Sequence, residues 1–266
     1  MTPSPPVKLI ATDMDGTLLA PDHRLSSRTL SAIDAARQAG IEVLPVTGRG
    51  FRSAVKILEP ARLETAICSN GALIYDLAGD RIAETRPIAG DDVRSVVAHL
   101  RERMPAAIFG WETTVAASFE DGFHRNPPHG GSASGVSTHE PLHEVRSAIK
   151  LFLAHPEIVE SDLQHAVQPL LFPGMNVSTS GAPFVEVTAA GVDKATTLAR
   201  VAAARGFRRS EVMAFGDQMN DLAMLQWAGV GVAMGNARPE AKAVADEVTA
   251  SNSEDGVALL IEKLLG

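Results

Sequence analysis

Short apolar runs alternate with segments of helical periodicity near both ends of the chain. A continuous run of Val, Leu, Ile and Ala is typical of a strand that is buried on both faces of a parallel sheet, whereas apolar residues three and four positions apart indicate a helix. This pattern predicts strands over residues 7–12, 41–46, 65–70, 212–215 and 229–235, and helices over residues 27–39, 52–58 and 194–205. The order of these elements predicts an α/β fold with a parallel sheet.

The pattern changes in the middle of the chain. Residues 72–75 and 81–85 read as a hairpin, which βαβ units do not normally contain, and an amphipathic helix over residues 91–103 is followed by several short strands. We therefore expect two domains: a discontinuous core of residues 1–85 and 189–266, and an inserted α+β domain of residues 86–188.

Composition and charge exclude several classes of protein. With 266 residues, 45% of them hydrophobic, the chain is long enough to form two packed domains. A formal net charge of −8 argues against nucleic acid or an anionic membrane as a partner, because both require clustered Lys and Arg. Cys68 is the single cysteine, and no apolar run reaches about 18 residues. We expect a cytoplasmic protein without a signal peptide, either a monomer or a small homo-oligomer.

The first predicted strand runs directly into Asp13-Met14-Asp15-Gly16-Thr17-Leu18. Ligands of open α/β sheets bind at the carboxyl ends of the strands, and Gly16 allows the backbone to turn sharply there. Asp13 and Asp15 would lie so close that their charges repel each other, so either Mg²⁺ is bound there or one carboxyl group is protonated. Asp and Gly are also ordinary turn residues, but this string after an apolar strand is far more specific.

Two further segments supply groups that suit a phosphate. Thr47, Gly48 and Arg49 follow the second strand, where a hydroxyl and adjacent backbone N–H groups can hold a phosphoryl oxygen. Lys194 falls in the first turn of a predicted helix, where a cation is unfavourable for the helix dipole, and this position hints at a role other than local stability. Without further context, a plain turn would be the favoured interpretation of the first segment, and a solvated surface residue that of Lys194.

The strand predicted over residues 212–215 leads into Gly216-Asp217-Gln218-Met219-Asn220-Asp221. Asp217 can reach a cation held by Asp13 and Asp15, while Asp221, one turn further on, can orient a ligating water or Lys194. The predicted metal-binding residues are therefore Asp13, Asp15, Asp217 and Asp221.

In this order, the four segments resemble the four motifs of the haloacid dehalogenase superfamily of phosphohydrolases. The position and α+β pattern of the insert resemble its Cof-like, class IIB branch. The resemblance implies a doubly wound, Rossmann-like parallel-sheet core, an inserted cap over the active site, and Mg²⁺ as cofactor. It further implies the following roles: Asp13 as nucleophile, Asp15 as acid and base, and Thr47, Gly48, Lys194 and Asn220 as phosphoryl-binding residues. Gln218 stands where that branch more often has a small or acidic residue.

We therefore expect a Mg²⁺-dependent phosphomonoesterase that acts on a small phosphorylated metabolite, such as a sugar phosphate or a phosphorylated cofactor, through an aspartyl-phosphate. A phosphomutase of the same superfamily would share the four motifs. A noncatalytic metabolite-binding protein is a third interpretation, which the intact set of acidic and basic residues disfavours. Because the motifs handle only the phosphoryl group, we assign specificity to the insert, above all to residues 119–124, with hinges near residues 84–87 and 188–191.

The insert also contains a pattern typical of zinc proteases. His139-Glu140-Pro141-Leu142-His143 has the H-E-x-x-H spacing, whose mechanism requires both histidines on one face of a helix. Proline is tolerated only in the first turn of a helix, so a helix that begins at Pro141 would exclude His139. We therefore expect no zinc site there.

Overall fold

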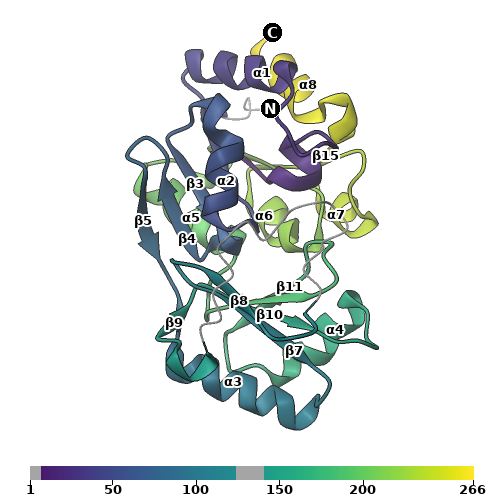
Figure 1. Cartoon of the computed structure of the whole chain (residues 1–266). Helices are drawn as coiled ribbons and strands as arrows, with labels where there is room; N and C mark the ends of the chain where they lie inside the picture. The colour runs from purple at the N-terminus through teal and green to yellow at the C-terminus, as the bar shows by residue number, and fades with distance from the viewer. Residues whose placement is uncertain (1–6, 124–140) are drawn as a thin grey trace. The chain divides into compact units, whose positions relative to one another are not determined.

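The computed structural model describes residues 7–123 and 141–266, and these fall into two compact units (Figure 1). The core unit comprises the chain up to Ala83 together with Lys194–Gly266, and the inserted unit comprises Glu84–Asp193. His139 and Glu140 of the H-E-x-x-H pattern lie outside the described residues.

A five-stranded parallel sheet forms the centre of the core unit. Its strands are β1 (Leu9–Thr12), β2 (Glu42–Pro45), β13 (Val212–Gly216), β14 (Val230–Ala233) and β15 (Glu247–Val248), in the order β15-β14-β13-β1-β2. In register, Ile10 lies between Val43 of β2 and Met213 of β13. All four residues of β1 are buried, which agrees with the continuous apolar run that predicted a central strand. The predicted doubly wound α/β fold is confirmed.

A second small sheet continues from the edge of this one. Val46, just after β2, forms a parallel bridge with Ile67 of β3 (Thr65–Cys68). Strand β3 pairs antiparallel with β4 (Leu73–Asp76), which adjoins β5 (Arg81–Thr85) as the predicted hairpin. The prediction that the third strand reaches residue 70 was wrong, because the strand ends at Cys68 and Ser69–Gly71 form a turn.

Three helices of the core unit agree with the periodicity: α1 (Ser27–Gln38), α2 (Phe51–Leu58) and α5 (Lys194–Ala204). The structure adds three that were not predicted: α6 (Leu222–Trp227), α7 (Pro239–Val244) and α8 (Gly256–Leu265). Helix α1 starts where expected, because the side chain of Ser26 accepts a hydrogen bond from the amide of Thr29. Helices α1 and α8 lie side by side (Figure 1), and the guanidinium of Arg28 binds the carboxylate of Glu262 through two hydrogen bonds.

The inserted unit is built on an antiparallel sheet. Its strands are β7 (Ile108–Glu112), β8 (Ala117–Phe119), β10 (Lys150–Ala154), β11 (Asn176–Ser178) and β12 (Val185–Thr188), in the order β11-β12-β10-β7-β8. Strands β6 (Ile88–Ala89) and β9 (Ser147–Ala148) form a separate pair. Alternate sheet residues such as Phe109 and Leu151 pack in one apolar cluster with α3 (Gly90–Arg103) and α4 (Glu160–Val167). The inserted unit therefore has the α+β architecture that its sequence pattern predicted.

The opposite face of this sheet carries the segment to which we assigned specificity. Phe119 and Phe123 are each 7% exposed and pack with Phe152, with ring centroids 5.4 and 6.4 Å from that ring. Phe184 completes the cluster. These side chains are packed against one another, and His124 lies outside the described residues.

No helix among residues 7–123 and 141–266 is long and apolar enough to span a membrane.

Candidate active site

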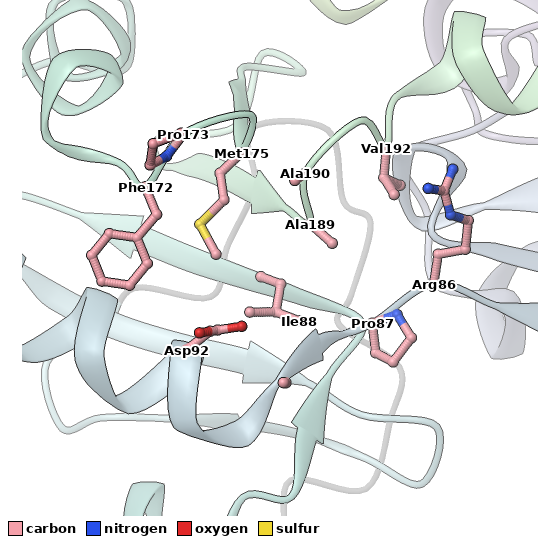
Figure 2. A pocket seen from close by; sticks show the side chains of 11 residues that line it. Arg86, Pro87, Ile88, Asp92, Phe172, Pro173, Met175, Ala189, Ala190 and Val192 are labelled. Carbon is pink, nitrogen blue, oxygen red and sulfur yellow. The ribbon is translucent and has the colours of Figure 1, made fainter.

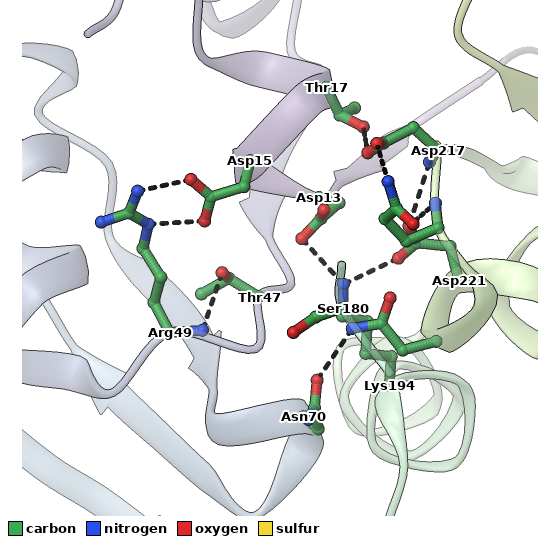
Figure 3. Close-up of polar contacts among 12 residues, drawn as sticks. Asp13, Asp15, Thr17, Thr47, Arg49, Asn70, Ser180, Lys194, Asp217 and Asp221 are labelled. Atoms are coloured by element: carbon green, nitrogen blue, oxygen red, sulfur yellow. Dashed lines mark hydrogen bonds and ion pairs between the residues drawn. The ribbon is translucent and has the colours of Figure 1, made fainter. Parts of the chain in front are cut away.

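The predicted site residues of the core unit come together where their elements begin or end (Figure 3). Asp13 directly follows β1, Thr47 lies just after β2, Asp217 follows β13, and Lys194 is the first residue of α5. Parallel strands place their carboxyl ends at one edge of the sheet, which brings together residues that are up to about two hundred positions apart in the chain.

Lys194 links two of the acidic segments. Its Nζ donates hydrogen bonds to Oδ1 of Asp13 and to Oδ1 of Asp221, both at 2.7 Å, and the residue is 1% exposed. Burial alone lowers the pKa of Lys194, but the charges of Asp13 and Asp221 outweigh this effect and raise the pKa above its ordinary value. Lys194 is therefore a fixed cation within the site, and a solvated surface role is excluded.

Three carboxylates lie close to this lysine, and its single positive charge cannot neutralise all three. Within the described residues, Asp13, Asp217 and Asp221 form a buried group whose ligand atoms all lie within 4.8 Å of one another. Burial raises the pKa of Asp13 well above its usual value, with further increases from its acidic neighbours, and Lys194 opposes them only in part. Burial and the charge of Asp221 raise the pKa of Asp217 to about 7. The group is therefore suited to a further cation with a preference for oxygen ligands.

The contacts of Asp221 distinguish it from the other two carboxylates. Its Oδ1 accepts from Lys194, and its Oδ2 accepts from the backbone amides of Asp217 and Gln218 at 3.0 and 2.9 Å. Asp217 is oriented by two side chains. The hydroxyl of Thr17 donates to its Oδ1 at 2.7 Å, and the side-chain amide of Gln218 donates to its Oδ2 at 3.1 Å. The side chain of Gln218, whose effect the sequence left open, thus helps to orient Asp217.

Gly16 is required by the close approach of Asp217. Its φ is +74°, and a Cβ atom at this position would lie 2.4 Å from Oδ2 of Asp217. The turn after Asp15 therefore needs glycine for two reasons, its left-handed backbone and its lack of a side chain.

The side chain of Asp15 lies apart from the three-carboxylate group and points to Arg49 (Figure 3). Nε of Arg49 donates to Oδ2 of Asp15 at 2.5 Å, and Nη2 donates to Oδ1, so the contact is bidentate. Nδ1 of His23 lies 3.2 Å from Oδ1 of the same carboxylate. Arg49 also donates to the hydroxyl of Ser53, which fixes the far side of the guanidinium.

Sequence reasoning named Arg49 only as part of a motif and did not single out His23. The sequence feature that could have identified Arg49 as a site residue is its position near Thr47 at the end of a predicted strand. His23 lies in a loop with a φ of +61°, and nothing in the sequence pattern pairs it with Asp15.

The predicted phosphoryl-binding residues occupy two loops of this site. Thr47 is 1% exposed, and its Oγ1 accepts from the amide of Arg49 at 3.1 Å across Gly48. Asn220 donates from Nδ2 to Oδ1 of Asn70 at 3.1 Å. The structure thus places Thr47 and Asn220 in the same unit as Lys194, and it adds Asn70 as a neighbour that the sequence did not predict.

The zinc pattern of the insert is only partly described. Pro141 precedes a short turn of residues 142–144, and the side chain of His143 is 77% exposed. The described part of this segment therefore lacks the helix that the zinc mechanism requires.

The inserted unit contains a pocket of about 460 Å³ that includes none of the predicted site residues (Figure 2). Its walls are largely apolar, with Ile88, Phe172 and Met175 on facing segments, and Arg86 and Asp92 are its charged residues.

Comparison with known proteins identifies the family. The sequence profile of the haloacid dehalogenase-like hydrolases matches residues 10–261. The chain is 33% identical over 258 residues to a 5-amino-6-(5-phospho-D-ribitylamino)uracil phosphatase of Bacillus subtilis, covering 96% of this chain and 94% of the relative. It is 30% identical over 266 residues to a pyridoxal phosphate phosphatase of Escherichia coli, covering 96% and 97%.

A solved structure of a subclass IIB sugar phosphatase shares the fold, with a TM-score of 0.79 and 24% identity over 97% of this chain and 98% of that one. The match spans both units, so the likeness is not limited to the sheet that carries the four motifs. The chain belongs to the haloacid dehalogenase-like hydrolases and is a phosphatase of that family.

Proposed function

We propose that the protein is a Mg²⁺-dependent phosphomonoesterase that hydrolyses small phosphorylated metabolites through an aspartyl-phosphate on Asp13. The observation that carries this proposal is the buried group of Asp13, Asp217 and Asp221 around Lys194, with Asp15 held separately by Arg49. One carboxylate is thereby placed beside fixed positive charge, and a second is kept apart from it as a proton carrier.

The donor set fits Mg²⁺, which prefers oxygen ligands. Asp13 and Asp217 would hold the ion, together with the backbone carbonyl of Asp15, and the bound ion would shield the nucleophile from the anionic substrate. Asp221 was predicted as a further ligand. Because Lys194 and two backbone amides already engage both of its oxygens, we assign it the role of orienting Lys194 and the Asp217 loop.

In the first step, a carboxylate oxygen of Asp13 attacks phosphorus, the bond from phosphorus to the leaving oxygen breaks, and Asp15 protonates that oxygen. Lys194, the hydroxyl of Thr47 and the amide of Gly48 bind the phosphoryl oxygens and balance their charge. In the second step, Asp15 takes a proton from water, the water oxygen bonds to phosphorus, and the bond to Asp13 breaks to release phosphate.

The proposed class of leaving group follows from the relatives. The two curated phosphatases act, by their names, on a ribitylamino-uracil phosphate and on pyridoxal phosphate. Both are small phosphate monoesters that carry a heterocycle. We propose that the substrate is a metabolite of this size and that the protein acts in the cytoplasm. The inserted unit would act as a cap that binds the leaving group and selects among substrates.

The test is phosphate release from p-nitrophenyl phosphate and from a panel of phosphorylated metabolites. We expect activity that disappears on chelation, returns with Mg²⁺, and is absent in Asp13→Asn. Asp15→Asn should accumulate phosphoenzyme from the aryl ester, because an amide cannot activate water.

Activity retained by Asp13→Asn, or restored by Zn²⁺ alone, would contradict the proposal. Transfer of the phosphoryl group to a sugar, with a bisphosphate requirement, would instead establish a phosphomutase.

A further inference from the structure

The turn at the end of β3 has an unusual backbone. Ser69, Asn70 and Gly71 have φ values of +50°, +54° and +97°, so three consecutive residues are left-handed. Ser69 and Asn70 are 0% and 3% exposed. A left-handed serine is costly, and such conformations persist only where the surrounding structure enforces them, most often at functional sites.

The backbone of this turn holds the loop that carries Thr47. The amide of Asn70 donates to the carbonyl of Thr47 at 3.0 Å, and the amide of Ser69 donates to the carbonyl of Arg49 at 2.9 Å. Two successive backbone amides of the turn therefore fix the carbonyls of the residues on either side of Gly48. The left-handed conformation is what directs these two amides toward the same loop.

The turn also contacts the two other phosphoryl-binding segments of the core unit. The carbonyl of Gly71 accepts from the hydroxyl of Thr197 at 2.9 Å, on the helix that Lys194 begins. The Oδ1 of Asn70 accepts from Nδ2 of Asn220 at 3.1 Å (Figure 3). With its Nδ2 held in this way, Asn220 has a buried Oδ1 without a hydrogen-bond partner. This oxygen can only accept a hydrogen bond, from a water or hydroxyl that enters with the ligand, whereas the second hydrogen of Nδ2 remains as the donor for a phosphoryl oxygen.

We propose that Asn70 is a positioning residue for phosphoryl binding, which aligns the Thr47 loop through its backbone and Asn220 through its side chain. The inference rests on the proposed function in that it takes this site to bind a phosphoryl group. Asparagine suits the position for two reasons: it tolerates a left-handed backbone, and its side chain supplies the acceptor that orients Asn220.

The test separates the side chain from the backbone. Asn70→Gly keeps the left-handed turn but removes the acceptor, and Asn220→Ala removes its partner. With inorganic phosphate as the probe and Mg²⁺ present, calorimetry should show a dissociation constant raised about fivefold by either change, the scale of one lost hydrogen bond. The double variant should be no weaker than Asn220→Ala alone, because Asn70 acts through that residue. The KM for p-nitrophenyl phosphate should rise by the same factor.

Arg62→Gly is the matched control. Arg62 is also left-handed, with a φ of +49°, but it ends a turn that carries none of the site residues. This variant should leave phosphate affinity unchanged. Should Asn70→Gly not fold, Asn70→Ser keeps a small polar side chain that is too short to reach Asn220 and gives the same comparison.

Unchanged phosphate affinity in Asn70→Gly, or full additivity with Asn220→Ala, would overturn the inference. Phosphate binding requires no turnover, so the two proposals fail separately. A protein that binds phosphate through Asn70 but hydrolyses no phosphomonoester contradicts the proposed function alone.

Discussion

The contact between Arg49 and Asp15 shows how one residue can fix the geometry of another. A carboxylate that carries protons in two successive steps must face the leaving oxygen first and a water molecule later, so its position matters as much as its acidity. The planar guanidinium holds both oxygens of Asp15, while Ser53 holds the guanidinium. A lysine could match the charge but not the two-pronged geometry.

Arg49→Gln should therefore lower kcat by about tenfold to a hundredfold and leave KM nearly unchanged, because the misplaced group acts in the chemical steps. Arg49→Lys should recover only part of the loss. Steady-state kinetics with an aryl phosphate measures both. Arg52→Gln is the control, since Arg52 lies over the ring of Phe51, 4.6 Å from its centroid. A rise in KM with kcat unchanged would instead assign Arg49 to substrate binding.

Gly16→Ala should weaken Mg²⁺ binding by about tenfold or more, because the added Cβ displaces the carboxylate of Asp217. The Mg²⁺ concentration for half-maximal activity reports this change. Gly40→Ala is the matched control, because its φ is +79° and nothing lies within 4 Å of the added Cβ. Both variants should lose about 1 kcal/mol of stability from the left-handed backbone, but only the first should lose metal affinity. Equal metal affinity in the two would show that Asp217 is not a ligand.

At the scale of elements, the start of β13 is joined to the start of β1 by an ion-pair cluster. Glu211 accepts from the side chain and the backbone amide of Arg208 at 3.0 and 2.9 Å, and Nζ of Lys8 lies 2.9 Å from its Oε1. These contacts, those of Arg208 foremost, lower the pKa of Glu211 from 4.5 to about 2. The cluster thus anchors the two strands that deliver Asp13 and Asp217.

Because the pKa is lower in the folded protein, the charge of Glu211 stabilises the fold above pH 4.5, and this contribution is lost as the pH falls toward about 2. Glu211→Gln should therefore lower the melting temperature at pH 7, and the difference from the wild type should shrink between pH 4.5 and 3. Thermal unfolding at several pH values checks this. A difference that is constant with pH would show that packing, rather than charge, explains the effect.

At the scale of the whole molecule, the proposed catalytic groups all belong to the core unit, and the inserted unit has an apolar cluster of its own. If the inserted unit is the cap, removing it should affect the choice of substrate more than the phosphoryl-transfer chemistry. Replacing residues 84–193 with a short Gly-Ser linker should leave slow, Mg²⁺-dependent hydrolysis of a small aryl phosphate, while discrimination among metabolites collapses. Substrate ranking on the metabolite panel is the measurement. A folded core that keeps the parent's ranking would place specificity outside the inserted unit.

The sequence by itself determined the fold class and the order of the strands, and it indicated which acidic and basic residues follow them. Continuous apolar runs specify buried parallel strands locally, and Asp13, Asp217 and Lys194 lie directly at element ends. Since parallel strands share one carboxyl edge, the sequence order alone implies that these residues meet. The same local signals predicted an inserted α+β segment.

Only the tertiary structure showed which side chains and backbone groups of the site contact one another. The pairing of Asn70 with Asn220 joins positions 150 residues apart, and that of Asp15 with Arg49 joins two different loops. Such contacts depend on side-chain directions and backbone angles that no periodicity encodes, including the left-handed turn that ends β3 two residues before its predicted end. Our proposal for Asp221 also rests on such contacts, because they show which of its oxygens its neighbours already occupy.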